Sequence, residues 1–109
     1  MNAAAVTAYD IERIRATIRA AASVWGVSSS DIIGRSRAQP VALARQAAMT
    51  LVKHMTGISL AQIGECFGNR DHGSVKHAIN TIEKRMHKPR FRSQFGEVVH
   101  IVNTSSRKQ

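Results

Sequence analysis

Apolar side chains recur every three or four residues along most of this chain, which is the spacing of helices that each bury one face. The first such segment predicts a helix that begins at Asp10 as N-cap and stops at Gly26. Its inward stripe consists of Ile11, Ile14, Ile18, Ala21, Ala22 and Trp25. A short turn of helix through Ile33 follows, because Ser28 and Asp31 have the spacing of a capping box.

A connector over residues 34–40 precedes the next predicted helix, and Pro40 suits the first position of that helix. The helix covers Val41 to Met55 and is closed by Gly57. Its inward stripe consists of Ala44, Ala47, Ala48, Leu51, Val52 and Met55. Small residues on such a stripe allow helices to pack closely.

The segment from about Ser59 to Met86 has the layout of a helix-turn-helix. Ser59 and Gln62 have capping-box spacing at the start of a short helix, whose inward residues are Leu60, Ile63 and Phe67. Gly68 and Asn69 follow as a turn pair, since both residue types tolerate left-handed backbone angles. A longer helix then begins at Asp71, with the inward stripe Val75, Ala78, Ile79, Ile82 and Met86.

A last helix is predicted after Pro89 from the spacing of Phe91, Phe95, Val98, Val99 and Val102. Residues 98–102 alternatively read as a strand, and Gly96 weakens the helical interpretation. The fold class is therefore all-α, a compact bundle of five to six helices. We expect a flexible lead-in over residues 1–8, one helical domain over residues 9–103, and a frayed tail over residues 104–109.

Charge narrows the range of partners. The 109 residues include 16 Lys and Arg against 7 Asp and Glu, a net charge of +9 at pH 7. Such an excess attracts polyanions, which favours nucleic acid or an anionic lipid surface. Between residues 33 and 95, acidic residues occur at three positions, whereas basic residues occur at Arg35, Arg37, Arg45, Lys53, Arg70, Lys76, Lys84, Arg85, Lys88, Arg90 and Arg92.

Several other classes of protein find little support. Cys66 is the single cysteine, so no internal disulfide forms. No apolar run approaches the roughly 18 residues of a membrane span, and residues 1–8 do not resemble a secretory signal, so a cytoplasmic location is expected. His72 and His77 lie five residues apart and point away from each other on a helix, which argues against a metal site. We expect no metal and no cofactor.

The outward face of the helix that starts at Asp71 carries Gly73, Lys76, His77, Asn80 and Lys84, and Arg70, His72 and Ser74 surround its N-terminus. This face is either an ordinary solvated face or one that enters a major groove, where a helix tip meets base edges. Asp71 caps the helix, accepts from a cytosine amino group, or does both. Asp71, His72 and Ser74 are the residue types of a hydrolase triad, but one helical turn cannot hold them in that geometry, so no enzyme is expected.

The string Phe67-Gly68-x-Arg70-Asp71-His72-x-Ser74-Val75-x-His77-Ala78 closely resembles the signature of the C-terminal DNA-binding domain of DnaA, the bacterial replication initiator. Upstream, residues 35–37 and 44–46 resemble that family's basic loop and the long helix after it. The resemblance covers about residues 14–86. It implies a fold that reads duplex DNA through its helix-turn-helix.

The resemblance also implies roles for individual residues. Arg37 matches the loop arginine that enters the minor groove, and Asp71 and His72 match tip residues that approach base edges. The positions expected to bind DNA are Arg35, Arg37, Arg45, Lys53, Leu60, Ala61, Arg70, Asp71, His72, Gly73, Ser74, Lys76 and His77. At Gly73 the family usually carries a threonine, so the preferred DNA sequence is expected to be relaxed or shifted.

The predicted function is that of a stand-alone DnaA-like binder of double-stranded DNA in the bacterial nucleoid, which competes with or modulates the initiator at its boxes. The chain contains no phosphate-binding G-x-x-x-x-G-K-[ST] motif, so no nucleotide is expected. Two alternatives stay open: a transcription regulator with its own operators, and an adaptor that binds the initiator or another protein through residues 98–102. An anionic-membrane binder that uses the arginines of the first helix is a third, and we expect no membrane partner.

Overall fold

The computed structural model describes residues 5–107, and within them it contains helices and no strand. The helices are α1 (Ala8–Trp25), α2 (Ser29–Ile32), α3 (Val41–Met55), α4 (Leu60–Cys66), α5 (His72–Arg85) and α6 (Pro89–Arg107). This confirms the prediction of an all-α bundle of five to six helices with a helix-turn-helix between Ser59 and Met86. The Cα radius of gyration is 13.0 Å, the value typical of a folded chain of about 100 residues.

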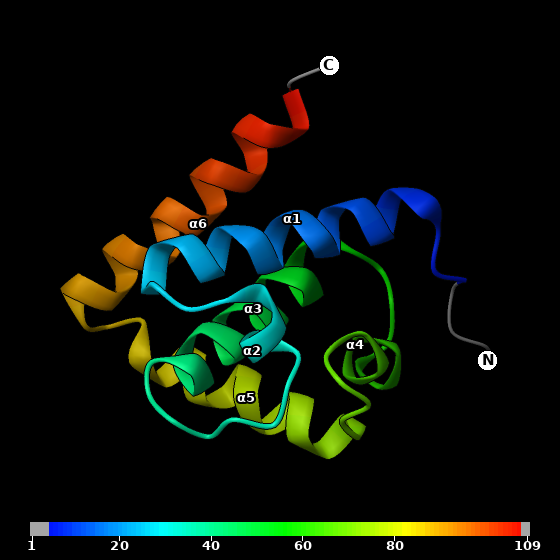
Figure 1. Ribbon diagram of the computed structural model, residues 1–109, viewed down its shortest axis with the longest axis horizontal. Helices are drawn as coiled ribbons and strands as arrows, with labels where there is room; N and C mark the ends of the chain where they lie inside the picture. Colours follow the sequence, from blue (N-terminus) through cyan, green and yellow to red (C-terminus); the bar gives the residue numbers. More distant parts are fainter. Residues whose placement is uncertain (1–4, 108–109) are drawn as a thin grey trace.

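Helix α3 lies at the centre of the bundle, between α1 on one side and α5 on the other (Figure 1). Its residues Ala44, Ala48 and Val52 are fully buried, as is Ala21 of α1. Because alanine side chains are small, the helices approach closely, and α6 then packs against α1. The core therefore depends on small and aliphatic residues in α1 and α3, and α3 in turn packs against α5.

The start of α1 differs from the prediction. Thr7, and not Asp10, is the N-cap: the Asp10 backbone N–H donates to Thr7 Oγ1 at 3.0 Å, and the Thr7 N–H donates to Asp10 Oδ2 at 3.1 Å. Asp10 is thus the returning partner of a capping box, and the helix starts at Ala8, inside the predicted lead-in. Residues 1–4 of that lead-in lie outside the described residues. The predicted stop at Gly26 is confirmed, in left-handed conformation with φ 67°.

Residues 98–102 form part of the helix α6 and not a strand. Val98 and Val102 are buried one helical turn apart, and at the start of α6 the ring of Phe91 stacks on Trp25 with 5.9 Å between centroids. This packing makes the helical spacing prevail over the local strand preference. Helix α6 also continues to Arg107, so the segment 104–107, expected to fray, is helical; residues 108–109 lie outside the described residues.

Candidate nucleic-acid interface

The helix-turn-helix is formed by α4, the turn of residues 67–71 and α5. Ser59 and Gln62 form the expected capping box at the start of α4, with Ser59 N to Gln62 Oε1 at 2.8 Å and Gln62 N to Ser59 Oγ at 3.1 Å. In the turn, Gly68 and Asn69 have φ of 84° and 60°, so both adopt the left-handed conformation predicted for this pair. Asp71 then caps α5 by accepting the Ser74 N–H at 2.8 Å.

Two glycines bring this turn into direct backbone contact with its neighbours. The Arg70 N–H donates to the Gly64 carbonyl at 2.9 Å, and a Cβ placed on Gly64 would lie 1.8 Å from the Arg70 carbonyl oxygen. A Cβ on Gly68 would lie 2.3 Å from the Ile33 carbonyl oxygen. The start of α5 is therefore held against α4 on one side and against the α2–α3 loop on the other.

Arg45 links the same loop to α3. It is 6% exposed, and its guanidinium donates from Nε to Ile32 O at 2.6 Å and from Nη2 to Asp31 O at 2.9 Å and Gly34 O at 3.4 Å. Its side chain therefore satisfies the last carbonyls of α2, which a helix end leaves without intrahelical partners.

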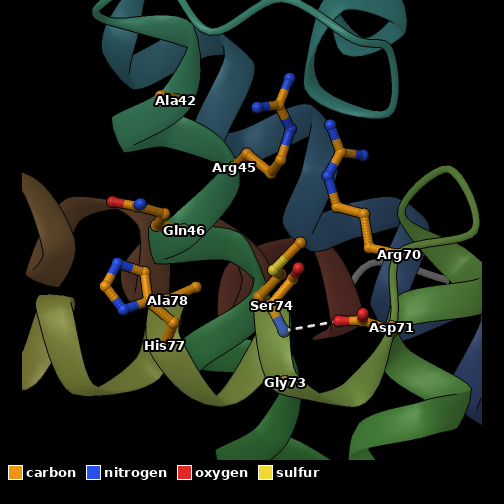
Figure 2. A pocket seen from close by; sticks show the side chains of 10 residues that line it. Ala42, Arg45, Gln46, Arg70, Asp71, Gly73, Ser74, His77 and Ala78 are labelled. Carbon is orange, nitrogen blue, oxygen red and sulfur yellow. Dashed lines mark hydrogen bonds between the residues drawn. The ribbon is translucent and has the colours of Figure 1, made fainter.

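Arg70 reaches the loop from the opposite side. It is half-buried, and its guanidinium donates to the Phe67 carbonyl within the turn and to Gly34 O at 2.6 Å. Arg45 and Arg70 thus share one acceptor, the Gly34 carbonyl, and we call this pair the arginine clamp; both side chains point toward the loop in Figure 2.

Burial lowers the pKa of both clamp arginines, and the positive charges of Arg70 and Arg35 respectively lower it further. Guanidinium groups titrate far above neutral pH, so both remain charged. The sequence predicts Arg45 and Arg70 as DNA contacts, whereas the donors described here are directed to carbonyls of the protein itself.

The start of α5 is surrounded by shallow hollows that share Arg70 and Asp71. One lies between α3 and α5 and includes Gln46, Ser74 and His77 (Figure 2). The others extend the surface to further positions: Arg35 and Arg37 on the α2–α3 loop, and Ala61 and His72 at the edge of α4 and the tip of α5. We call this combined surface the tip surface.

Most of the predicted DNA-binding residues lie on the tip surface, and many of its side chains are exposed. The exposed residues among those predicted are Arg35, Arg37, Ala61, Asp71, His72, Gly73, Ser74 and His77. The remaining predicted residues Lys53, Leu60 and Lys76 line a different hollow, which also contains His54 and Glu83. Gln46 is not among the residues predicted from the sequence, although it directly follows Arg45 in α3 and lines two of the hollows.

Between residues 5 and 107, no three His, Cys, Asp or Glu side chains gather as a metal ion would require. None of the helices within residues 5–107 combines the length and the hydropathy that a membrane-spanning segment needs. Cys66 is half-buried, and burial raises the pKa of its thiol, with the Glu65 charge adding to the effect.

Asp71 makes the stability of α5 dependent on pH. Hydrogen bonds from the backbone and side chain of Ser74 lower the pKa of Asp71 below its ordinary value of 3.8. A carboxylate with a lowered pKa stabilises the fold above the pKa of the unfolded chain, and this contribution is lost as the pH falls through the folded value. We therefore expect Asp71→Ala to lower the Tm at pH 7, and the difference from wild type to shrink in acid below about pH 3.8.

Asp71→Asn provides the matched control for thermal unfolding followed by circular dichroism. Asparagine caps a helix about as well as aspartate but does not titrate, so its Tm should stay near that of wild type at pH 7. A Tm difference between wild type and Asp71→Ala that stays constant from pH 7 to pH 2 would show that the ionised cap does not stabilise α5.

Comparison with known proteins places this geometry in a family. The model of the bacterial dnaA protein helix-turn-helix matches residues 13–82. The chromosomal replication initiator protein DnaA of Chlorobaculum tepidum is 47% identical over 68 residues, which are 62% of this chain and 14% of that protein. The initiator of Neisseria meningitidis serogroup C is 42% identical over 67 residues, 62% of this chain and 13% of that protein.

A longer match extends beyond the family model. The DnaA of Nitrosomonas eutropha is 36% identical over 93 residues, which are 84% of this chain and 20% of that protein. The chain therefore spans a fifth or less of the length of these relatives.

Proposed function

Because the chain belongs to the family of bacterial DnaA helix-turn-helix domains, we propose that it binds duplex DNA, with the tip of α5 in the major groove and the Arg37 loop in the minor groove. The observation that carries the proposal is the tip surface, on which Arg35, Arg37 and the exposed first turn of α5 lie together. A major groove about 12 Å wide admits a helix.

The chemistry of the α5 tip suits base edges. The Ser74 hydroxyl donates or accepts, the His77 ring presents a nitrogen donor, and the Asp71 carboxylate accepts from a cytosine amino group. At position 73, a Cβ would meet Asp71 Oδ1 at 3.6 Å, an ordinary contact, so the backbone leaves room there for a side chain. The fold thus does not require the glycine, and the glycine lacks the threonine side chain that the family usually presents to the DNA, which supports an altered preference at that position.

Arg37 is suited to a narrow minor groove. It is exposed on the α2–α3 loop, which is anchored behind it by the arginine clamp. Narrow A·T-rich minor grooves have an enhanced negative potential that attracts an inserted arginine. The two grooves would thus be read by two elements that the fold holds in one arrangement.

At the cellular level, the proposed role is to compete with or modulate the replication initiator at its boxes, on the nucleoid. Competition requires shared site preference and no further activity. The relatives are named as replication initiators, and the matching segment is the part from which this preference would come. The adaptor alternative loses the feature that suggested it, because Val98 and Val102 are buried in the core.

The test is fluorescence anisotropy on an initiator-box duplex and a scrambled duplex of equal composition, across a salt series. Wild type should prefer the box at moderate salt, and Arg37→Ala should lose about 1–3 kcal/mol on the box, as for a lost base-directed contact. The matched control is Lys53→Ala, which should weaken binding to both duplexes alike through a lost phosphate contact. Equal, steeply salt-dependent binding of wild type to both duplexes would eliminate the competitor role and turn the search to other operators.

A further inference from the structure

A second group of cations lies at the far end of α5 from the tip surface. Residues 84–92 contain five cations and no carboxylate, and we call this group the basic turn: Lys84, Arg85, Lys88, Arg90 and Arg92. The turn joins α5 to α6 on the side of the bundle opposite the helix-turn-helix turn (Figure 1). Among the described residues, no acidic side chain forms an ion pair with these cations.

Some cations of the basic turn stabilise the fold. Lys84 and Arg85 lie in the last turn of α5, where positive charge interacts favourably with the helix dipole. The Arg85 guanidinium also lies 5.9 Å from the ring centroid of Phe91, and Arg92 Nη1 donates to Met86 O at 3.0 Å. These interactions give the turn a defined shape.

Lys88 and Arg90 have no such role. Both are exposed, and they flank Pro89 at the N-terminus of α6, where no acidic residue occupies the first turn. A helix N-terminus carries partial positive charge, so cations there are unfavourable for the helix itself. The fold therefore gains nothing from these two charges, whereas an external anion would interact favourably with them.

The length of α5 indicates that the anion bound by Lys88 and Arg90 is the DNA backbone. Its 14 residues rise about 1.5 Å each, so the basic turn lies about 20 Å from the tip. A recognition helix with its tip at the bases can bring its opposite end to the DNA backbone, as in homeodomains. At 3.4 Å per base pair, 20 Å corresponds to about six base pairs.

We propose that Lys88 and Arg90 bind phosphates of the same duplex on one side of the site that the tip surface reads. This inference rests on the proposed DNA binding and extends it from a compact site to a longer, one-sided footprint. A single domain of this fold has no two-fold symmetry, so each bound domain places the additional contact on one flank of its site and not on both.

The experiment compares a minimal box duplex with duplexes extended by about ten base pairs on the left or on the right flank. The variant is Lys88→Gln with Arg90→Gln, and the matched control is Arg15→Gln with Arg19→Gln, which removes two exposed charges from α1. Anisotropy is measured for each protein over a salt series, and thermal unfolding verifies that each variant is folded.

Wild type and the α1 variant should bind one extended duplex more tightly than the minimal duplex, and the basic-turn variant should lose that gain. On that duplex, its slope of log affinity against log salt should fall by about 2, since each lost phosphate contact removes about 0.9. Three results would overturn the inference: no gain in affinity from extending either flank, an equal gain in affinity from both flanks, or a gain in affinity that the basic-turn variant retains. Failure of the proposed function would give a different result, because wild type would then not prefer even the minimal box duplex over a scrambled duplex.

Discussion

Replacing Gly64 with alanine should lower the free energy of unfolding by about 3 kcal/mol. The added Cβ would lie 1.8 Å from the Arg70 carbonyl oxygen, and this obstacle is backbone, which cannot rotate out of the way. Either α4 moves away from the turn or the Arg70 N–H loses its bond to Gly64 O. Urea unfolding monitored by circular dichroism measures the effect.

Gly96→Ala is the matched control for this substitution. Gly96 also lies in a helix, but nothing lies within 4 Å of its added Cβ, so alanine there should stabilise the chain by about 1 kcal/mol. If Gly64→Ala proved as stable as wild type, the close approach of α4 to the start of α5 would be refuted. Box binding by any folded Gly64→Ala protein should also fall, because the tip of α5 would be displaced.

The second large effect is expected at Arg45. Arg45→Met should cost about 3 kcal/mol of stability, because it leaves the carbonyls of Asp31, Ile32 and Gly34 without this donor in a largely buried site. Box binding should fall as well, since the loop that carries Arg37 loses its anchor. Urea unfolding and anisotropy on the same samples measure the two effects.

Arg45→Lys separates an anchoring role from direct phosphate contact. Lysine keeps the charge, but one ammonium group lacks the fork of donors with which arginine reaches several carbonyls. We therefore expect Arg45→Lys to lose stability and box affinity together, while Arg37→Ala loses affinity alone. If Arg45→Lys retained both properties of wild type, Arg45 would act as a simple charge and the clamp would not anchor the loop.

The elements that the sequence predicts well are those determined by residues close together along the chain. The Ser59–Gln62 capping box, the left-handed pair Gly68 and Asn69, and the Asp71 cap each depend on residues within four positions of one another. The misplaced start of α1 has a local cause too. Thr7 and Asp10 have capping-box spacing, and that signal identifies the true start.

The unpredicted features depend on contacts between distant segments. Gly64 resembles any glycine in a short helix until α5 is folded against it, and Arg45 resembles any cation of a basic protein until its guanidinium meets the end of α2. Residues 98–102, where a helix is predicted with a strand as the alternative, show the same limit of local sequence. A run of β-branched residues suits a strand unless a core already receives every third or fourth side chain. Of the candidate site, the sequence predicts the residues at the tip of α5, but it does not predict the Gly64 contact and the Arg45 hydrogen bonds that hold the tip and the loop in place.

The shared Gly34 carbonyl has a consequence for the DNA as well as for the protein. Since one acceptor ties the Arg37 loop both to α3 and to the turn before α5, the distance between this loop and the tip of α5 is fixed. In the proposed mode of binding, the distance between the two DNA grooves that they enter is then fixed as well. One inserted base pair between the two halves of a site would shift them apart by 3.4 Å and rotate them by about 35°. A tethered loop cannot follow that movement, so in the proposed mode of binding the spacing within a site is as much a part of its identity as its bases.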